Sequence, residues 1–238
     1  RVYRNCRFAV ISPSTRDDLV ARGIPEQNVD VVLCGLDHDR FRLLEGLNRY
    51  EAPTIVHFGR VRKYKAIDVV IRAFARIRRN LPDARLVVIG DGPELQNLKT
   101  LARRLVPEQS VDFTGRVTTD TMVEILNRCH LFMNDCPKEG WGLTVVEANA
   151  CGVPVVGSNR PGLKDSILDK KTGFLAEYGD VDGFAARGLE LLKNRDLWQS
   201  MSAAGLQWAR SLTWQRTADE MEVLFKRDAG FSGTAGDG

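Results

Sequence analysis

Short apolar runs rich in β-branched residues recur along the chain, and segments with helical periodicity separate most of them. Several runs are apolar at nearly every position, which is typical of strands buried on both faces of a parallel sheet. The pattern predicts an α/β fold, a Rossmann-like three-layer parallel sheet with helices on both faces. The runs lie at residues 7–12, 29–36, 54–60, 84–92, 111–117, 130–136, 153–158 and 172–177.

Helical patterns support this fold class. After residue 65, apolar side chains recur at the spacing of one helix face, and the opposite face is rich in arginine. That apolar stripe consists of Ile67, Val70, Ile71, Phe74 and Ile77. From residue 180 onward the strand-like runs stop, and residues 180–196, 197–211 and 213–228 predict three consecutive helices.

The order of these elements divides the chain into segments. One strand, one helix and one strand over residues 1–37 are too few for a domain, so they are predicted to be the end of a truncated N-terminal domain. Residues 38–53 are polar and aperiodic, as in a linker. The main domain is predicted over 54–212, and a C-terminal helix that crosses back over 213–229. The tail, 230–238, has no apolar periodicity and is expected to be disordered.

Composition excludes some classes of protein. The 34 Lys and Arg against 31 Asp and Glu leave a net charge of only +3, which gives no bulk electrostatic case for nucleic-acid binding. The five cysteines are scattered, without a C-x-x-C pair, and are interpreted as reduced core thiols of a cytoplasmic protein. No apolar run reaches the roughly 18 residues that a membrane-spanning helix needs.

The stretch KEGWGLTVVEANACGVPVV, residues 138–156, carries the most specific chemistry. A turn containing Gly140 and Gly142 leads from a strand into a helix, and the free amides at a helix start attract anions. Amides of Gly142, Leu143 and Thr144 are therefore candidates for binding a phosphate group. Two carboxylates, Glu139 and Glu147, flank this turn and are better suited to accept hydrogen bonds from sugar hydroxyls.

Cations for such a phosphate come from another loop. Arg60 ends the run at 54–60, and Lys65 begins the next helix, so both should lie at the sheet edge that carries the Gly142 turn. Arg binds two phosphate oxygens in a fork, and Lys acts as a point charge. The alternative is that Arg60, Arg62, Lys63 and Lys65 only form a solvated loop.

Four motifs in order carry a family resemblance. HFGRVRKYKAIDVVIRAF, LVVIGDGPELQNL, VDFTGRV and KEGWGLTVVEANACGVPVVGSNRPGLKDSI resemble the donor-binding half of a family 4 (group 1) retaining glycosyltransferase of GT-B fold, over almost the whole chain to about residue 228. The resemblance implies sugar transfer from a UDP- or GDP-linked donor to an acceptor with retention, without a metal or other cofactor.

The resemblance also implies roles for individual residues. Arg60 and Lys65 would bind the donor diphosphate together with the turn amides, which include Gly140 and Trp141. Glu139 would face the transferred sugar, and Glu147 the ribose hydroxyls. The loop with Arg116 and Val117 would border the base. Electrostatic stabilisation of the leaving diphosphate by Arg60, Lys65 and these amides is the expected main contribution to catalysis.

Partners follow from the same resemblance. The acceptor would be a sugar, a lipid-linked sugar or another small molecule, bound mostly by an N-terminal domain that this chain lacks. Peripheral contact with the inner face of a membrane is a further expectation. Two departures concern Ala66, where the family usually has Gly, and Asp165, where Glu is common.

Alternatives stay open at this stage. The chain could be a nucleotide-sugar-binding module without catalysis, or a nucleotide-sugar epimerase. GDGPEL at 90–95 lacks the third glycine of a dinucleotide fingerprint, which makes a nicotinamide site unfavoured. The D-x-D pairs at 37–39 and 180–182 are better explained by turns and caps than by a metal. Structural roles are expected for His38, His57 and His130, and core positions for Trp198, Trp208 and Trp214. Trp141 could flank the sugar or cover the loop.

Overall fold

A computed structural model describes residue 3 and residues 6–228. The predicted disorder of residues 230–238 lies outside this range. All eight apolar runs form strands, as predicted. The bounds are β1 (Phe8–Val10), β2 (Val29–Val31), β3 (Thr54–Phe58), β4 (Arg85–Ile89), β5 (Val111–Gly115), β6 (Leu131–Asn134), β7 (Val155–Ser158) and β8 (Gly173–Ala176).

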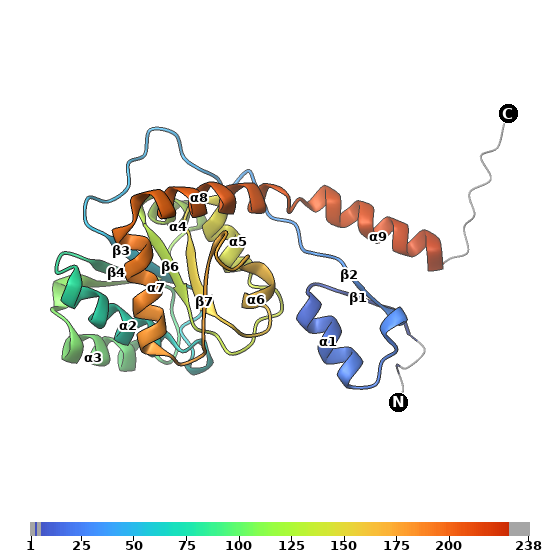
Figure 1. The fold of residues 1–238 in the computed structure, drawn as a ribbon, viewed down its shortest axis with the longest axis horizontal. Helices are drawn as coiled ribbons and strands as arrows, with labels where there is room; N and C mark the ends of the chain where they lie inside the picture. Colours follow the sequence, from blue (N-terminus) through green and yellow to red (C-terminus); the bar gives the residue numbers. More distant parts are fainter. Residues whose placement is uncertain (1–2, 4–5, 229–238) are drawn as a thin grey trace.

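Six of the strands form one parallel sheet with the order β5-β4-β3-β6-β7-β8. Helices cover both faces (Figure 1), so the sheet is the middle of three layers. The helices are α1 (Pro13–Ala21), α2 (Ile67–Asn80), α3 (Leu95–Leu105), α4 (Thr119–Arg128), α5 (Leu143–Ala150), α6 (Leu163–Ser166), α7 (Val181–Lys193), α8 (Arg195–Arg210) and α9 (Trp214–Asp228). The Rossmann-like fold class is confirmed.

Each face of the sheet has its own core. One core joins the sheet to α2, α3 and α7, and the other joins it to α4, α5 and α6. The predicted stripe of α2 lies in the first core, where all five of its side chains are at most 2% exposed. Burial of such a stripe stabilises a helix mainly through the roughly 25 cal/mol gained per Å² of apolar surface removed from water.

The start of α2 is strained at one residue. Ala66 has φ 47° and ψ 38°, the left-handed conformation that a Cβ disfavours by about 1 to 2 kcal/mol. The family that this sequence resembles usually has glycine at this position. The sequence departure therefore has a conformational consequence, because the backbone keeps the turn that glycine would allow without strain.

We expect Ala66→Gly to raise the free energy of unfolding by about 0.5 to 1 kcal/mol, since the relief of strain exceeds the loss of one buried methyl group. Urea denaturation of both proteins measures this difference. Ala75→Gly, inside the same helix, is the control and should lower stability by about 1 kcal/mol. An unchanged or lowered stability of Ala66→Gly would contradict the argument.

The N-terminal segment and the last helix contact each other. β1 and β2 form a separate two-stranded parallel sheet, and α9 extends beside it (Figure 1). Oγ1 of Thr217 donates to the Leu33 carbonyl at 2.7 Å, and Arg227 pairs with Asp30 at 2.6 Å. A β-bridge between Leu36 and Thr213 joins the end of the N-terminal segment to the start of the C-terminal helix region. The proposed assignment of these pieces to two domains stays a prediction.

The prediction of core thiols holds for three of the cysteines. Cys129, Cys136 and Cys151 are buried and free. Cys34 is only half-buried, and Cys6 is exposed because it precedes β1 instead of lying within it. The interpretation of Cys6 as a core thiol was therefore wrong.

Candidate active site

The strand order places a topological switch point between β3 and β6, where open α/β sheets have their ligand-binding crevice. From β3 the chain proceeds to β4 and β5 on one side, whereas β6 leads to β7 and β8 on the other side. The loops that leave the carboxyl ends of β3 and β6 therefore diverge, and ligands of open α/β sheets bind at such a switch point. The loop after β3 carries Arg60 and Lys65, and the loop after β6 carries Glu139.

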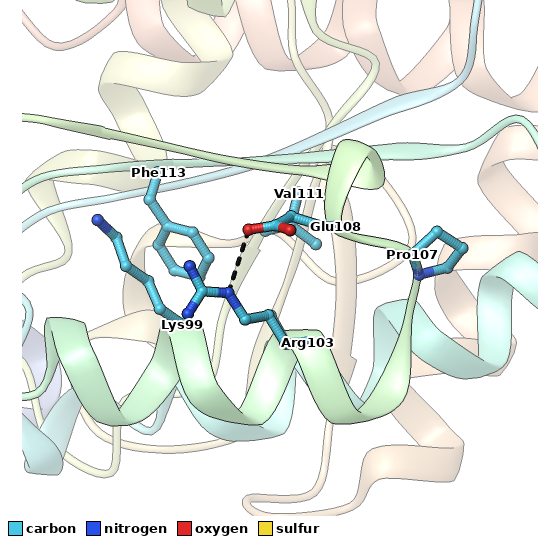
Figure 2. Close-up of a pocket in the computed structure, with 7 residues that line it drawn as sticks. Lys99, Arg103, Pro107, Glu108, Val111 and Phe113 are labelled. Atoms are coloured by element: carbon cyan, nitrogen blue, oxygen red, sulfur yellow. Dashed lines mark hydrogen bonds and ion pairs between the residues drawn. The ribbon is translucent and has the colours of Figure 1, made fainter.

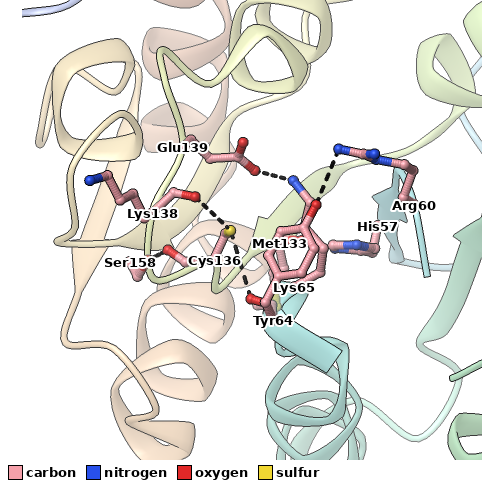
Figure 3. Close-up of polar contacts among 9 residues, drawn as sticks. All are labelled: His57, Arg60, Tyr64, Lys65, Met133, Cys136, Lys138, Glu139 and Ser158. Atoms are coloured by element: carbon pink, nitrogen blue, oxygen red, sulfur yellow. Dashed lines mark hydrogen bonds and ion pairs between the residues drawn. The ribbon is translucent and has the colours of Figure 1, made fainter. Parts of the chain in front are cut away.

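Lys65 and Glu139 meet across this crevice. Lys65 ends a short 3-10 helix (Lys63–Lys65), and its Nζ forms an ion pair with Oε1 of Glu139 (Figure 3). The Lys65 side chain is 13% exposed and the Glu139 side chain 20% exposed, so the pair is largely shielded from solvent. Lys65 therefore does not belong to a merely solvated loop, in contrast to Arg60, Arg62 and Lys63, which are exposed.

Arg60 lies beside this pair. Its Nη2 donates to the Tyr64 hydroxyl at 3.3 Å, and Nζ of Lys65 is 5.3 Å from the centre of the Tyr64 ring. Figure 3 shows the cationic ends of Arg60 and Lys65 on either side of that hydroxyl. Two cations and one carboxylate thus converge at the mouth of the crevice, and the Tyr64 hydroxyl, whose role no sequence pattern predicted, lies between the cations.

The turn before α5 presents free backbone donors. Gly142 caps α5 with φ 88° and ψ 49°, and its amide and those of Leu143 and Thr144 donate to no backbone carbonyl in the described part of the chain. The Thr144 hydroxyl is buried and, among the described residues, also lacks a hydrogen-bond partner. Such unpaired donors at a helix start suit an anion.

Glycines shape this turn by close packing. A Cβ on Gly142 would lie 2.6 Å from Oγ of Ser166, and a Cβ on Gly140 would lie 3.0 Å from Cδ1 of Ile11. Gly142 therefore needs to be glycine, both for its positive φ and for its fit against α6, whereas a side chain at position 140 would only press on the end of the Ile11 side chain.

Gly162 positions Glu139 and was missed by sequence analysis. Its φ is 86°, and a Cβ there would lie 2.3 Å from the Glu139 carbonyl oxygen. The Glu139 amide donates to the Pro161 carbonyl at 3.0 Å. Asp165 caps the Gly162 amide at 2.9 Å, so the aspartate that replaces the more common glutamate holds this contact.

Glu147 lies one turn inside α5 and is mostly buried. Burial without a nearby cation raises its pKa to about 7. With a pKa near 7, the Glu147 carboxyl group is partly ionised at neutral pH, and its carboxylate form accepts hydrogen bonds from hydroxyl groups. Asp135, at the end of β6, is a second buried carboxyl whose pKa desolvation raises to about 7, although its Oδ2 accepts a hydrogen bond from the Gly179 amide at 3.0 Å.

The raised pKa of Glu147 makes stability depend on pH. Its folded-state pKa lies above the usual value of 4.5, so its contribution to stability is complete below pH 4.5 and is lost as the pH rises through 7. We expect Glu147→Gln to reduce the stability difference between pH 5 and pH 8 by about 1 to 2 kcal/mol. Urea unfolding at both pH values measures it.

The exposed Glu177→Gln serves as the control and should leave that difference unchanged. Equal pH dependence of Glu147→Gln and the unsubstituted protein would show that Glu147 titrates normally.

Trp141 takes the second of its two predicted roles. The side chain is 2% exposed and packs edge-on against Trp208, with ring centres 6.4 Å apart. The indole therefore covers the loop from the core side, and only the backbone of Trp141 remains available in the turn. The expected core position of Trp214 was wrong, because this residue is 57% exposed.

Arg116 and Val117 lie at the same edge of the sheet, directly after β5. Arg116 is exposed, and Val117 is half-buried and packs against the core that contains Phe58. Two strands, β4 and β3, separate this loop from β6. The loop is thus at the edge of the crevice and outside the Lys65–Glu139 contact.

The histidines have the structural roles that were expected. Nδ1 of His57 lies 2.9 Å from the Met133 carbonyl, and burial lowers its pKa to about 4. Nε2 of His38 lies 3.0 Å from the Leu212 carbonyl, and Nδ1 of His130 accepts from the Thr54 amide at 3.1 Å. Each ring joins segments distant in sequence.

The competing motifs are explained by turns and caps. Asp180 caps α7 by accepting from the Gly183 amide at 3.0 Å, and Asp37 accepts from the Arg40 amide at 3.3 Å. Gly90 and Gly92 allow the β4 turn to lie against the β3 loop, because Cβ atoms there would be 1.9 and 2.2 Å from the carbonyl oxygens of Gly59 and Val61.

A separate hollow of about 180 Å³ lies between α3 and β5 (Figure 2). Arg103 and Glu108 line it and form an ion pair, with 3.1 Å between Nε of Arg103 and Oε1 of Glu108. It contains none of the predicted site residues and belongs to the outer strand of the sheet. No helix over the described residues has the length and apolar character to cross a membrane.

Comparisons with known proteins identify the family of this chain. A family model described as "Glycosyl transferases group 1" matches residues 39–208. The chain is 32% identical over 234 residues to the GDP-mannose-dependent alpha-(1-6)-phosphatidylinositol monomannoside mannosyltransferase of Mycobacterium tuberculosis, covering 92% of this chain and 61% of that protein. It is 37% identical over 147 residues to N-acetyl-alpha-D-glucosaminyl L-malate synthase of Bacillus anthracis, covering 62% of this chain and 38% of that protein.

Solved structures show the same fold. HepE of Anabaena in complex with UDP-glucose superposes with a TM-score of 0.82 at 18% identity, over 94% of this chain and 65% of that one. A glycosyltransferase from Rickettsia africae gives a TM-score of 0.85 at 17% identity, over 97% of this chain and 67% of that one.

Proposed function

Because the chain belongs to the group 1 glycosyl transferase family, we propose that it binds a nucleotide-diphosphate sugar and serves a transferase that moves the sugar to an acceptor. The observation that carries the proposal is the meeting of Lys65 and Glu139 at the switch point of the sheet, beside Arg60 and the free amides before α5. The chain spans 61% of the length of the mannosyltransferase described above, so acceptor binding is proposed for the intact enzyme.

The diphosphate would lie between the two loops. Arg60 and Lys65 supply positive charge, and the amides of Gly142, Leu143 and Thr144 supply oriented donors. When the bond between the sugar and the diphosphate breaks, negative charge grows on the diphosphate, and donors fixed in advance stabilise it without reorganisation. Because these side chains and amides supply part of the stabilisation that a metal ion would otherwise give, we propose transfer without a metal.

The carboxylates have different proposed tasks. Glu139 contacts Lys65 and would orient the sugar above the diphosphate. We also propose that transfer retains the configuration at the anomeric carbon. Glu147, inside α5, would accept hydrogen bonds from the ribose hydroxyls. Arg116 and Val117 at the crevice edge would border the base.

A thermal-shift panel of nucleoside diphosphates and their sugars tests the proposal. A ligand that binds only the folded state raises the melting temperature, by an amount that grows with its concentration relative to Kd. We expect UDP or GDP and the matching sugar nucleotide to stabilise the chain, whereas nucleoside monophosphates should have a smaller effect. Absence of any shift at millimolar nucleotide would refute it.

Transfer assays separate the remaining functions. A non-catalytic module would bind donor in calorimetry without transfer in the intact enzyme. An epimerase would change the donor sugar in acceptor-free buffer, which product analysis detects. Retention is tested by the anomeric configuration of the product, and metal independence by activity in the presence of a chelator.

A further inference from the structure

A cavity of about 490 Å³ lies at the edge of the sheet opposite the candidate active site. Pro53 and His130, which directly precede β3 and β6, form part of its wall. The end of α7 and the start of α8 form the other side, at the tight turn visible in Figure 1. Since strands of four to five residues span about 15 Å, this cavity is separate from the Lys65–Glu139 crevice. It is lined by Arg49, Pro53, His130, Leu191, Leu192, Lys193, Arg195, Trp198 and Gln199.

Arg49 brings a mostly buried cation to this cavity. Its guanidinium donates to backbone carbonyls, including Asn127 at 3.2 Å and Gly152 at 2.8 Å, and its Cζ lies 4.6 Å from the centre of the Trp198 ring. Over the described residues it forms no ion pair. Burial lowers the pKa of Arg49, which reflects a positive charge with no carboxylate to offset it.

Two further cations lie at the rim. Lys193 and Arg195 are exposed, and neither forms an ion pair within the described ranges. Arg195 is the first residue of α8, where the helix dipole disfavours a cation by a few tenths of a kcal/mol. Asp196 on the same turn does not line the cavity. The hydrogen bonds of Arg49 link residues 38–53 to the sheet. That structural role does not explain why Lys193 and Arg195 also lie at this cavity.

Neutral donors add to this charge. Nδ1 of His130 accepts from the Thr54 amide, so the ring proton is on Nε2 and makes the ring a further donor. Gln199 offers an amide. All charged groups that line the cavity are positive, and its other walls are the apolar side chains of Pro53, Leu191, Leu192 and Trp198.

From the cationic rim and apolar walls of one cavity, we propose that this site binds an anionic amphiphile, a molecule with a phosphate or carboxylate head and an apolar body. The head would lie between Lys193, Arg195 and Arg49, and the body against Trp198 and the two leucines. A volume of about 490 Å³ falls within the range of roughly 300 to 1,000 Å³ seen for small-molecule sites.

Isothermal titration calorimetry with decyl phosphate below its micellar concentration tests the proposal. We expect one molecule bound per chain, and binding at least about tenfold weaker in the double variant Lys193→Gln/Arg195→Gln, because two charges near the head are lost. Both side chains are exposed, so the variant keeps the fold. Decanol and inorganic phosphate should each bind much more weakly than decyl phosphate.

Controls separate this site from other cationic surfaces. The double variant Arg104→Gln/Lys171→Gln removes the same charge outside the cavity and should bind decyl phosphate normally. Saturating UDP or GDP should leave the binding unchanged, which distinguishes it from the crevice site. Equal binding by both double variants, competition by the nucleotide, or no binding at all would overturn the proposal.

Vesicles distinguish the source of the amphiphile. One comparison uses vesicles of phosphatidylcholine with an anionic phospholipid and vesicles of pure phosphatidylcholine. It tests whether the site binds a lipid in a bilayer surface and not only a dissolved molecule. Sedimentation of the chain with the anionic vesicles, lost in Lys193→Gln/Arg195→Gln, would support a membrane lipid as ligand. Decyl phosphate binding without vesicle binding would support a soluble amphiphile.

Discussion

Glu139→Gln should abolish most sugar transfer while nucleoside diphosphate binding becomes tighter. In the free protein the Glu139 carboxylate holds the Lys65 ammonium, and a bound diphosphate would place further negative charge beside it. Replacing the carboxylate by an amide frees Lys65 and removes the like charge, so we expect affinity to rise about 3- to 10-fold. Loss of sugar orientation should lower transfer in the intact enzyme at least about 100-fold.

Calorimetry with the matching nucleoside diphosphate measures the affinity, and product formation measures transfer. Glu177→Gln, an exposed carboxylate just after β8, removes the same charge farther along the same sheet edge and should change neither quantity. Weaker diphosphate binding by Glu139→Gln would mean that Glu139 contacts the nucleotide itself. Normal transfer would refute its role at the sugar.

The sheet could be predicted from sequence because its strands are buried on both faces. Val155 and Val156 in β7 are both inaccessible to solvent, and such continuous apolar runs leave little alternative to a parallel sheet between two helical layers. The sequence also predicted that Lys65 and the turn with Glu139 lie at one edge of the sheet, because parallel strands bring the loops after their carboxyl ends together. No local pattern in the sequence specifies that these two residues would neutralise each other.

What escaped prediction depends on contacts between distant segments. Gly162 supports the Glu139 backbone from a loop beyond β7, and nothing in its neighbouring residues marks that role. Trp141 could not be placed because its direction depends on Trp208, in α8. The charge around Arg49 was missed for the same reason: Lys193 and Arg195 belong to the turn between α7 and α8, far from the linker in sequence.

Lys65→Met should weaken nucleoside diphosphate binding at least about tenfold and lower transfer about 100- to 1,000-fold. The ammonium is held at the crevice by its contact with Glu139, with only 13% of the side chain exposed, so its charge acts on the diphosphate with little screening by water. The substitution also leaves Glu139 without its cation, which adds repulsion toward the diphosphate. Calorimetry and the transfer assay measure the two effects.

Lys63→Met is a close control, because it removes the same charge from the same loop at an exposed position. It should alter diphosphate binding by less than about twofold, as expected for a screened surface charge. The double variant Lys65→Met/Glu139→Gln completes the test: if Lys65 acts directly on the phosphates, removing the Glu139 charge restores only part of the lost affinity. Full restoration of the affinity would show that Lys65 serves only to neutralise Glu139. Equal losses of affinity in Lys63→Met and Lys65→Met would show that the loop acts only through its overall positive charge.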